Sequence, residues 1–459
     1  MLERILRTAE SLLPKDMYRF SQPAYHYFLA LLGAIVYRFP SRKLTVIMVT
    51  GTKGKTSTAE LLNSIFEANG ATTALLGTLR FKIGAESERN MRKMTVPGRL
   101  FVQHFLRKSV DAGCTHAIIE MTSEGARQYR HYFIDMDALI FTNLAPEHIE
   151  SHGSYENYRD AKLSIARALA RSSKSQRFMV ANADDKEGEK FARTPNVTPI
   201  PFRLKDSDPV IVDDKHVELT FRGVRVNSPL PGIFNAYNIL AAAMCASMFG
   251  VPPNIVAAGV ARTTRIEGRM ERIEEGQAFP VIVDYAHTPD SLEQAYKTFP
   301  CHEKICVLGN TGGGRDTWKR PIMGEIADNY CAKVILTNED PYDEDPQKIL
   351  EEMRAGFTKQ KTETILDRRL AIRHALEIAQ GLTLQQGFRP SPSMLKTSSE
   401  SLTNSSVLKH SAEHPQGQNV AVLITGKGTD PFIMGPNGTK EPWDDRTVAR
   451  EELQKLLGV

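Results

Sequence analysis

The segment VTGTKGKTST, residues 49–58, has the residue types of a phosphate-binding loop. It follows an apolar run and opens a helical pattern. Gly51 and Gly54 permit a tight turn whose backbone N–H groups point at phosphate. Lys55 can then reach the β- and γ-phosphates, and the Thr56 hydroxyl can bind Mg²⁺. The spacing GxxGKT is shorter than the general GxxxxGKT, but the order of strand, loop and helix predicts an ATP site.

Two further segments place carboxylate, imidazole and amine groups after strand-like runs. Glu120 ends THAIIEM, where its carboxylate can hold Mg²⁺ on the γ-phosphate. His148 and Lys162 lie in TNLAPEHIESHGSYENYRDAK, directly after the run DALIFT. Taken alone, this stretch is more typical of a solvated loop followed by a helix than of a site, and Glu120 is equally typical of a metal ligand and a surface acid. Beside the phosphate loop, they predict a second group of ligands at the same sheet edge.

Short β-branched runs alternate with helical patterns along the chain. One series contains KLTVIMVTG, THAIIEM, DALIFTN and RFMVANAD, and a second contains PVIVDYAH, KICVLGNTGGG, KVILTNEDP and NVAVLITGKG. Continuous apolar strands separated by helices predict parallel, doubly wound α/β sheets. Functional residues should lie at the carboxyl ends of such strands.

The order of these patterns predicts three parts. Residues 1–43 should form a helical segment, residues 44–266 a central P-loop ATP-binding domain, and residues 267–459 a Rossmann-like α/β domain. Residues 381–418 are rich in Ser, Gln and Pro and show no apolar periodicity. That composition predicts a disordered surface insertion in the last domain.

The N-terminal segment contains YHYFLALLGAIVYRF, residues 25–39, which is mostly apolar. It is shorter than the roughly 20 residues that span a bilayer. Within residues 24–39, the spacing of Phe28, Leu31, Leu32, Ile35 and Val36 predicts one apolar helical face. We expect that face to pack on the ATP-binding domain or to rest on a membrane surface.

Bulk composition excludes several classes. Of 459 residues, 41% are hydrophobic and 24% charged, and the net charge of +4 is interspersed, which gives no reason to expect a nucleic-acid partner. The five cysteines are odd in number and form no CxxC, which argues for a reducing cytosol and against a disulfide framework or zinc ribbon. The first residues lack a signal-peptide pattern, so we expect a cytoplasmic protein. We also expect a monomer.

Seven motifs occur in the order seen in Mur ligases: VTGTKGKTST, EHIESHGSYENYRDAK, GIFNAYNILAAA, EGRMERI, VDYAHTPDSL, GGGRDTWKRPIMG and GKGTD with PWDDR. The chain resembles most closely the MurE type, which adds the third residue of the muramoyl peptide in peptidoglycan precursor synthesis. The resemblance runs from Leu44 to the end. It implies an ATP- and Mg²⁺-dependent carboxylate–amine ligase that works through an acyl phosphate. It also implies that Lys162 is carbamylated and reaches towards a second Mg²⁺, which His148 binds.

Other site residues are implied by their places in these motifs. The nucleotide positions, besides the loop residues Gly51, Thr52, Lys53, Gly54, Lys55, Thr56 and Ser57, are Asn238, Arg269, Asp284 and His287. The positions that match contacts to the muramoyl peptide are Thr95, Ser123, Gln128 and Arg130. Val96 replaces the second threonine of the usual TTP, and Glu124 replaces the usual histidine of SSHGxxQxR, so this part of the site is altered.

The resemblance also implies an amino-acid pocket. Arg315 matches a residue that binds the substrate carboxylate, and Gly426 and Asp430 match further contacts. Ligases that add diaminopimelate carry DNPR, but here the stretch is EDPY, with Tyr342 at the arginine position. Loss of that cation weakens the case for a distal carboxylate. Acidic Glu339, Asp340 and Asp430 favour a second amino group, as on lysine or ornithine.

The resemblance leaves alternatives. Family members usually begin with a domain that holds UDP, for which there is no room before Gly51. The UDP site can be reduced, the substrate can be lipid-linked, or the chain can act on another carboxylate. Folylpolyglutamate synthases also lack that domain, as do MurT-type ligases, which carry a four-cysteine zinc site not matched here. A non-catalytic, ATP-dependent binding module is the remaining alternative.

Overall fold

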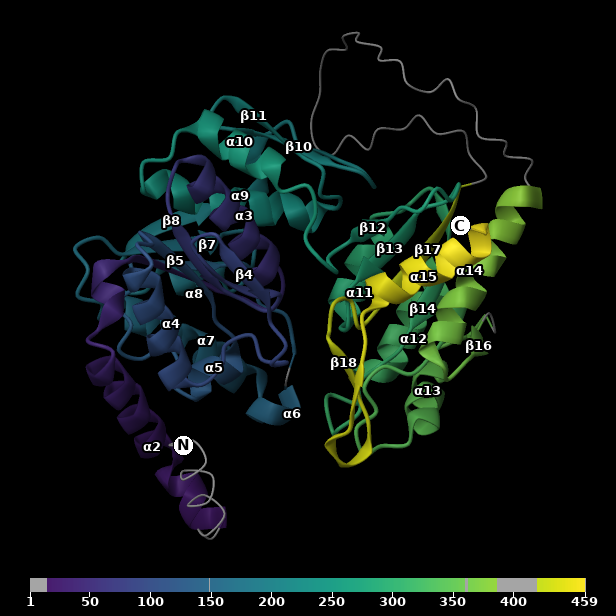
Figure 1. Ribbon diagram of the computed structural model, residues 1–459, viewed down its shortest axis with the longest axis horizontal. Helices are drawn as coiled ribbons and strands as arrows, with labels where there is room; N and C mark the ends of the chain where they lie inside the picture. The colour runs from purple at the N-terminus through teal and green to yellow at the C-terminus, as the bar shows by residue number, and fades with distance from the viewer. Residues whose placement is uncertain (1–14, 148, 360–361, 386–418, 459) are drawn as a thin grey trace.

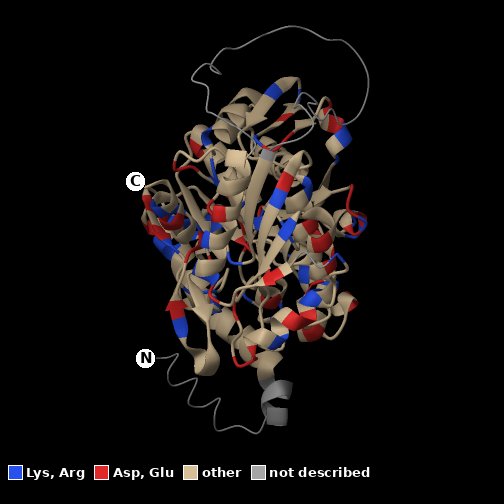
Figure 2. Ribbon diagram, turned by 90° about the vertical axis from the view of Figure 1, so that its right-hand side faces the viewer, with Lys and Arg blue, Asp and Glu red and all other residues tan. Residues whose placement is uncertain are grey.

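The computed structural model describes residues 15–147, 149–359, 362–385 and 419–458. Two α/β units lie side by side, the first coloured purple to teal and the second green to yellow (Figure 1). Basic and acidic residues are interspersed over the elements seen from the side of the second unit (Figure 2).

The first unit is built on an eight-stranded sheet with the order β4-β3-β2-β5-β1-β6-β7-β8. The strands from β2 to β8 in that order are parallel, and β3 and β4 add an antiparallel edge. Their bounds are β1 (Thr45–Thr50), β2 (Thr73–Leu76), β3 (Arg80–Ile83), β4 (Glu86–Arg89), β5 (His116–Glu120), β6 (Ala138–Phe141), β7 (Phe178–Asn182) and β8 (Thr198–Phe202).

Side chains of β1 alternate between two cores, as the pleat of a strand requires. Ile47 and Val49 pack with α3 (Lys55–Ala68), α9 (Ile233–Met248) and α10 (Pro253–Arg262). Val46 and Met48 pack with α4 (Arg99–Asp111) and α7 (Tyr155–Ala170) on the other face. Because both faces are covered, the strand reads as a continuous apolar run. The unit also contains α5 (Ser123–Arg127), α6 (Ile149–His152), α8 (Gly188–Ala192), β9 (Ile211–Val212), β10 (Val217–Phe221), β11 (Val224–Ser228) and the 3-10 turns η1 (Pro40–Lys43) and η2 (Leu204–Ser207).

The second unit has a six-stranded sheet with the order β12-β13-β17-β14-β15-β16, parallel except for β12. Helices α11, α12 and α13 cover one face, and α14 and α15 cover the other. The bounds are β12 (Glu271–Ile273), β13 (Val281–Asp284), α11 (Pro289–Lys297), β14 (His302–Leu308), α12 (Lys319–Tyr330), β15 (Lys333–Leu336), α13 (Pro346–Arg354), β16 (Thr362–Thr364), α14 (Arg368–Gln385), β17 (Asn419–Thr425), β18 (Phe432–Met434), η3 (Pro436–Gly438), β19 (Lys440–Pro442) and α15 (Asp445–Leu457).

The predicted fold class, a parallel α/β sheet followed by a second α/β unit, is confirmed. The predicted insertion at 381–418 begins too early, because α14 continues to Gln385. Residues 386–418 lie outside the described part of the chain. One disulfide joins Cys306 on β14 to Cys331 after α12. This bond differs from the expectation, based on the number and spacing of the cysteines, that they stay reduced. Sequence spacing does not show which cysteines meet across a sheet and its covering helix.

Helix α2 (Lys15–Val36) projects from the lower end of the first unit (Figure 1). It packs on α4 through buried Leu29, Ala30, Gly33 and Ala34. The expectation that the face with Phe28, Ile35 and Val36 packs on the ATP-binding domain is wrong, since these side chains are 61%, 55% and 58% exposed. The alternative, contact with a membrane surface, stays a prediction. The contact with α4 uses small residues because the two helices lie close together: a Cβ on Gly33 would already lie 3.1 Å from the Leu100 side chain. Among the described residues, none of the helices is long and apolar enough to span a bilayer.

This packing predicts opposite outcomes for two adjacent substitutions. Ala34→Glu puts a carboxylate where the side chain is fully buried. We expect it to lower the free energy of unfolding by about 1–3 kcal/mol, or to release α2. Ile35→Glu changes an exposed position and should stay within about 0.5 kcal/mol. Denaturant unfolding and limited proteolysis after α2 measure both. Equal effects of the two variants would contradict the observed orientation of α2.

Candidate functional site

A cavity of about 970 Å³ lies between the two units. Seventeen of the predicted site residues line it: Thr52, Lys53, Gly54, Lys55, Thr56, Ser57, Thr95, Asn238, Arg269, Asp284, His287, Arg315, Glu339, Asp340, Tyr342, Gly426 and Asp430. Gly51 belongs to the phosphate loop without lining the cavity, Lys162 bonds to the Gly51 carbonyl, and Glu120 bonds to Thr56 at the start of the following helix. The structure therefore gathers residues from most of the motifs into one site.

The phosphate loop connects β1 to α3. Gly54 has φ 80° and caps α3, and a Cβ there would lie 2.2 Å from Asn238 Oδ1. Both conditions require glycine. Asn143, which the sequence reading missed, fixes the loop: the N–H of Thr52 donates to its carbonyl at 2.9 Å and the N–H of Lys53 to its side-chain oxygen at 2.9 Å. The loop is thus held before phosphate binds.

Two lysine ammonium groups converge on the carbonyl oxygen of Gly51. Lys55 Nζ donates to it at 3.0 Å and Lys162 Nζ at 2.7 Å. Burial lowers the pKa of Lys55 to about 8, with Glu147 and Glu120 opposing the shift. Lys162 is 1% exposed, and burial followed by the charge of Lys55 lowers its pKa well below the usual value. Lys162 is therefore far easier to hold as a neutral amine than an exposed lysine.

Glu120 lies at the carboxyl end of β5, beside the start of α3. The Thr56 hydroxyl donates to Glu120 Oε2 at 2.9 Å, and the N–H of Thr78 donates to Oε1 at 2.8 Å. The Thr78 hydroxyl also bonds to Glu120, at 3.0 Å, and to Thr95, at 3.0 Å. This arrangement connects the phosphate loop to the predicted peptide contact Thr95.

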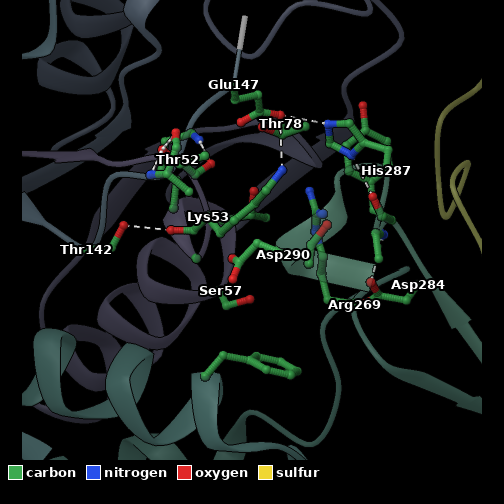
Figure 3. Close-up of a pocket in the computed structure, with 18 of the residues that line it drawn as sticks. Thr52, Lys53, Ser57, Thr78, Thr142, Glu147, Arg269, Asp284, His287 and Asp290 are labelled. Carbon is green, nitrogen blue, oxygen red and sulfur yellow. Dashed lines mark hydrogen bonds and ion pairs between the residues drawn. The ribbon is translucent and has the colours of Figure 1, made fainter. Parts of the chain in front are cut away.

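His148 lies outside the described residues, so its role as a metal ligand stays a prediction. Its neighbour Glu147, which was not singled out, bridges the two units: Lys53 Nζ lies 3.0 Å and His287 Nε2 3.1 Å from Glu147 Oε1 (Figure 3). Burial lowers the pKa of His287 to about 3. In the sequence, the feature that points to Glu147 as a site residue is the high number of acidic residues in this stretch.

Arg269 and Asp284 occupy the second unit's wall of the cavity (Figure 3). Asp284 accepts backbone N–H groups from Met270 at 2.7 Å and Ala286 at 2.8 Å, and burial raises its pKa. The Arg269 guanidinium stacks 4.5 Å from the centroid of the Tyr285 ring. Asn238 contacts the Thr58 hydroxyl at 3.3 Å, in the first turns of α3.

Three predicted peptide contacts lie away from the cavity lining. Ser123 Oγ is 3.1 Å from His152 Nε2. Arg130 donates to Gln128 Oε1 at 2.7 Å and also to the carbonyl of Val96. Burial lowers the pKa of Arg130 to about 10. Gln128 lies next to α2, because Arg99 on α4 donates to its carbonyl at 2.8 Å and also contacts His26 of α2.

The predicted amino-acid pocket is more nearly charge-balanced than its sequence indicated. Lys427 and Lys93 each pair with Asp340 and Asp430. Glu339 is buried, and its Oε2, like Asp430 Oδ1, has no hydrogen-bond partner among the described residues. Burial and the neighbouring Asp340 raise the pKa of Glu339.

Tyr342 and Arg315 form one wall of this pocket. The Arg315 guanidinium lies 5.2 Å from the centroid of the Tyr342 ring. A Cβ on Gly313 would lie 3.0 Å from the same ring, so glycine permits this close approach. The ring therefore limits the positions that the Arg315 fork can adopt.

Comparisons with known proteins agree with this site. Residues 49–246 match the Mur ligase middle domain, and residues 268–383 match the Mur ligase, glutamate ligase domain. A UDP-N-acetylmuramoyl-L-alanyl-D-glutamate–2,6-diaminopimelate ligase from Syntrophomonas wolfei is 35% identical over 367 residues, covering 77% of this chain and 74% of that protein. A UDP-N-acetylmuramyl-tripeptide synthetase from Roseiflexus is 35% identical over 455 residues, covering 93% and 82%.

Solved structures share the architecture. A structure of a UDP-N-acetylmuramoyl-L-alanyl-D-glutamate–2,6-diaminopimelate ligase matches with a TM-score of 0.56 and 26% identity, covering 90% of this chain and 79% of that one. A folylpolyglutamate synthase from Mycobacterium tuberculosis matches with a TM-score of 0.65 and 16% identity, covering 86% and 91%. The second likeness concerns the fold alone. The resemblance to the MurE type is confirmed by the relatives.

Proposed function

Because the chain belongs to the Mur ligase family, we propose that it uses ATP to join an amino acid to the carboxylate of a muramoyl-peptide substrate. One observation carries the proposal. The phosphate loop, with Thr56, and the Arg315 pocket line a single cavity between the units, and Glu120 lies behind the loop in contact with Thr56. A ligase needs its nucleotide, acceptor and amine together, because the activated carboxylate must meet the amine before water.

The reaction has two transfers. The acceptor carboxylate attacks the γ-phosphorus of ATP, which releases ADP and forms an acyl phosphate. The neutral α-amine of the amino acid then attacks the acyl carbon, loses a proton, and phosphate leaves. Lys55 and the N–H groups at the start of α3 are placed to stabilise negative charge on the transferring phosphoryl group. Arg315 is placed to hold the carboxylate of the amino acid with its planar fork.

The residues behind the loop fit Mg²⁺ once Lys162 is carbamylated. Among the described residues no cluster of three His, Cys, Asp or Glu side chains could hold a metal. Glu120 and Thr56 supply oxygen atoms for one Mg²⁺, and a neutral Lys162 amine can add CO₂ to give an anionic oxygen ligand, of the kind Mg²⁺ prefers, for a second ion. His148 is the other proposed ligand of that second ion. When bound, Mg²⁺ would neutralise charge on the phosphates.

For Lys162 we expect carbamylation that can be observed apart from turnover. Protein equilibrated with ¹³C-bicarbonate should show a carbamate carbon resonance that is absent in Lys162→Ala. Lys162→Ala should be nearly inactive and recover in part with short carboxylic acids. Lys55→Ala removes the phosphate contact together with the contacts of Lys55 to the carbonyls of Gly51 and Thr52. It should lose turnover but keep the resonance, because Lys162 remains and is buried. An active enzyme without the resonance would contradict the proposed ligand.

The amino-acid pocket favours a side chain with an amino group. Glu339 Oε2 and Asp430 Oδ1 are buried acceptors without partners among the described residues. Leaving such groups unpaired is costly, so a donor from the substrate stabilises the complex. Lysine and ornithine supply an ammonium group there. Diaminopimelate, named in the relatives, supplies one too but adds a carboxylate.

Tyr342 provides the test of side-chain choice. Tyr342→Arg adds a cation and should shift kcat/KM towards amino acids with a second carboxylate. One charge-assisted contact contributes about 1.5–3 kcal/mol, equivalent to roughly tenfold or more. Tyr342→Phe keeps the ring beside Arg315 and should leave the preference unchanged. An unaltered profile in Tyr342→Arg would show that this position does not contact the side chain.

The function itself is tested by phosphate release. UDP-muramoyl dipeptide, a lipid-linked muramoyl peptide and folate are each combined with a panel of amino acids. We expect release only with a muramoyl peptide and an amino acid together, and a loss of about 10²-fold or more in Lys55→Ala. Release with folate instead would favour a folylpolyglutamate synthase. Release that needs neither acceptor nor amino acid would favour an ATP-dependent binding module.

The exposed face of helix α2 is a surface through which the protein could approach a lipid-linked acceptor. Its exposed Tyr27, Phe28, Ile35 and Val36 form an apolar face, with Arg38 next to its end. We propose that this face contacts an anionic membrane surface. The Ile35→Glu protein retains the buried contact with α4 and should sediment less with anionic vesicles than the wild type. Equal sedimentation would remove this proposal.

A further inference from the structure

Lys93 connects the first unit to the amino-acid pocket of the second. It lies in the segment between β4 and α4. Its Nζ is 3.0 Å from Asp340 Oδ2, 3.1 Å from Asp430 Oδ2, and 3.0 Å from the carbonyl oxygen of Phe432. All three acceptors belong to the second unit. The ammonium group of one unit is therefore held by three acceptors of the other.

Lys427 binds the same three groups from within the second unit. Its Nζ is 2.9 Å from Asp340 Oδ1, 3.1 Å from Asp430 Oδ2 and 2.6 Å from the carbonyl of Phe432. Two ammonium groups thus balance two carboxylates. The side chains of Lys427 and Lys93 are 1% and 17% exposed, so solvent screens these contacts little.

Asp430 is oriented by this arrangement. Both lysines contact its Oδ2, which leaves Oδ1 buried and without a partner among the described residues. Asp340 is further held by the N–H of Met434 at 2.7 Å. Without Lys93, Asp340 and Asp430 would share one cation, and an incoming ammonium group could enter the vacated position at Oδ2. The α-amine of that amino-acid substrate would then lie farther from the acyl carbon.

We propose that Lys93 is a positioning residue for the amino-acid substrate: it fills the ammonium position at Asp430 Oδ2 and so leaves Oδ1 for the substrate. The inference rests on the proposed function. Because Lys93 comes from the first unit, the amino-acid pocket is complete only when the two units lie together. Productive amine binding is thereby linked to closure of the units around ATP and acceptor.

The test compares steady-state kinetics of the full chain with Lys93→Met, Lys93→Arg and the control Arg89→Met. Arg89 also crosses the interface, 2.9 Å from Asp444 Oδ2 and 2.7 Å from the carbonyl of Thr429, but those contacts avoid Asp340 and Asp430. We expect Lys93→Met to lower kcat/KM for the amino acid tenfold or more, with KM for ATP and acceptor within about twofold of wild type. Lys93→Arg should recover most of the loss.

The control separates positioning from simple attachment of the units. Arg89→Met should affect the three substrates to similar extents. If Lys93→Met does the same, or changes none of them, the inference is overturned. Thermal unfolding of each variant verifies folding, and Lys93→Gln, which also removes the ammonium group and carries the same expectation, replaces Lys93→Met if Lys93→Met is unstable. A wild-type protein that turns over no amino acid would instead refute the proposed function.

Discussion

The carbonyl oxygen of Gly51 accepts hydrogen bonds from the Nζ atoms of two lysines, and the phosphate-binding part of the site is organised around this contact. Lys55 comes from the start of α3 and Lys162 from α7, on opposite faces of the first sheet. Two cations so close and so buried destabilise each other, which adds to the lowering of the Lys162 pKa. Anionic phosphate would favour the charged form of Lys55 again. The loop is therefore electrostatically prepared for a polyanion.

The second constraint is that charged contacts connect the two units. Lys53, Glu147 and His287 form one such group. Glu150 forms another, accepting the N–H groups of Asp316 at 2.6 Å and Thr317 at 3.1 Å. Contacts of this type are lost at less cost than an apolar core, since the separated groups regain water. An interface built this way suits units that must part to admit substrates.

The N-terminal helix illustrates how packing selects among apolar faces. The pattern of large residues on α2 indicates one face, but α4 contacts the face of small residues around Ala30 and Ala34. Small residues let the two helices approach closely, which gives more packing contact than large side chains at the same positions would allow. The larger residues Phe28 and Ile35 are left outside, where they remain available for other surfaces.

The sequence by itself determined the features that depend on local backbone chemistry and on order along the chain. The turn at Gly54, the alternation of strands and helices, and the placement of Glu120 at a strand end follow from residues close in sequence. Only the tertiary structure decided which distant residues meet. Lys93 and Asp340 are far apart in the chain, as are Asn143 and Lys53, and Cys306 and Cys331 lie on different elements. Such contacts depend on how two sheets and their helices pack, which no local pattern records.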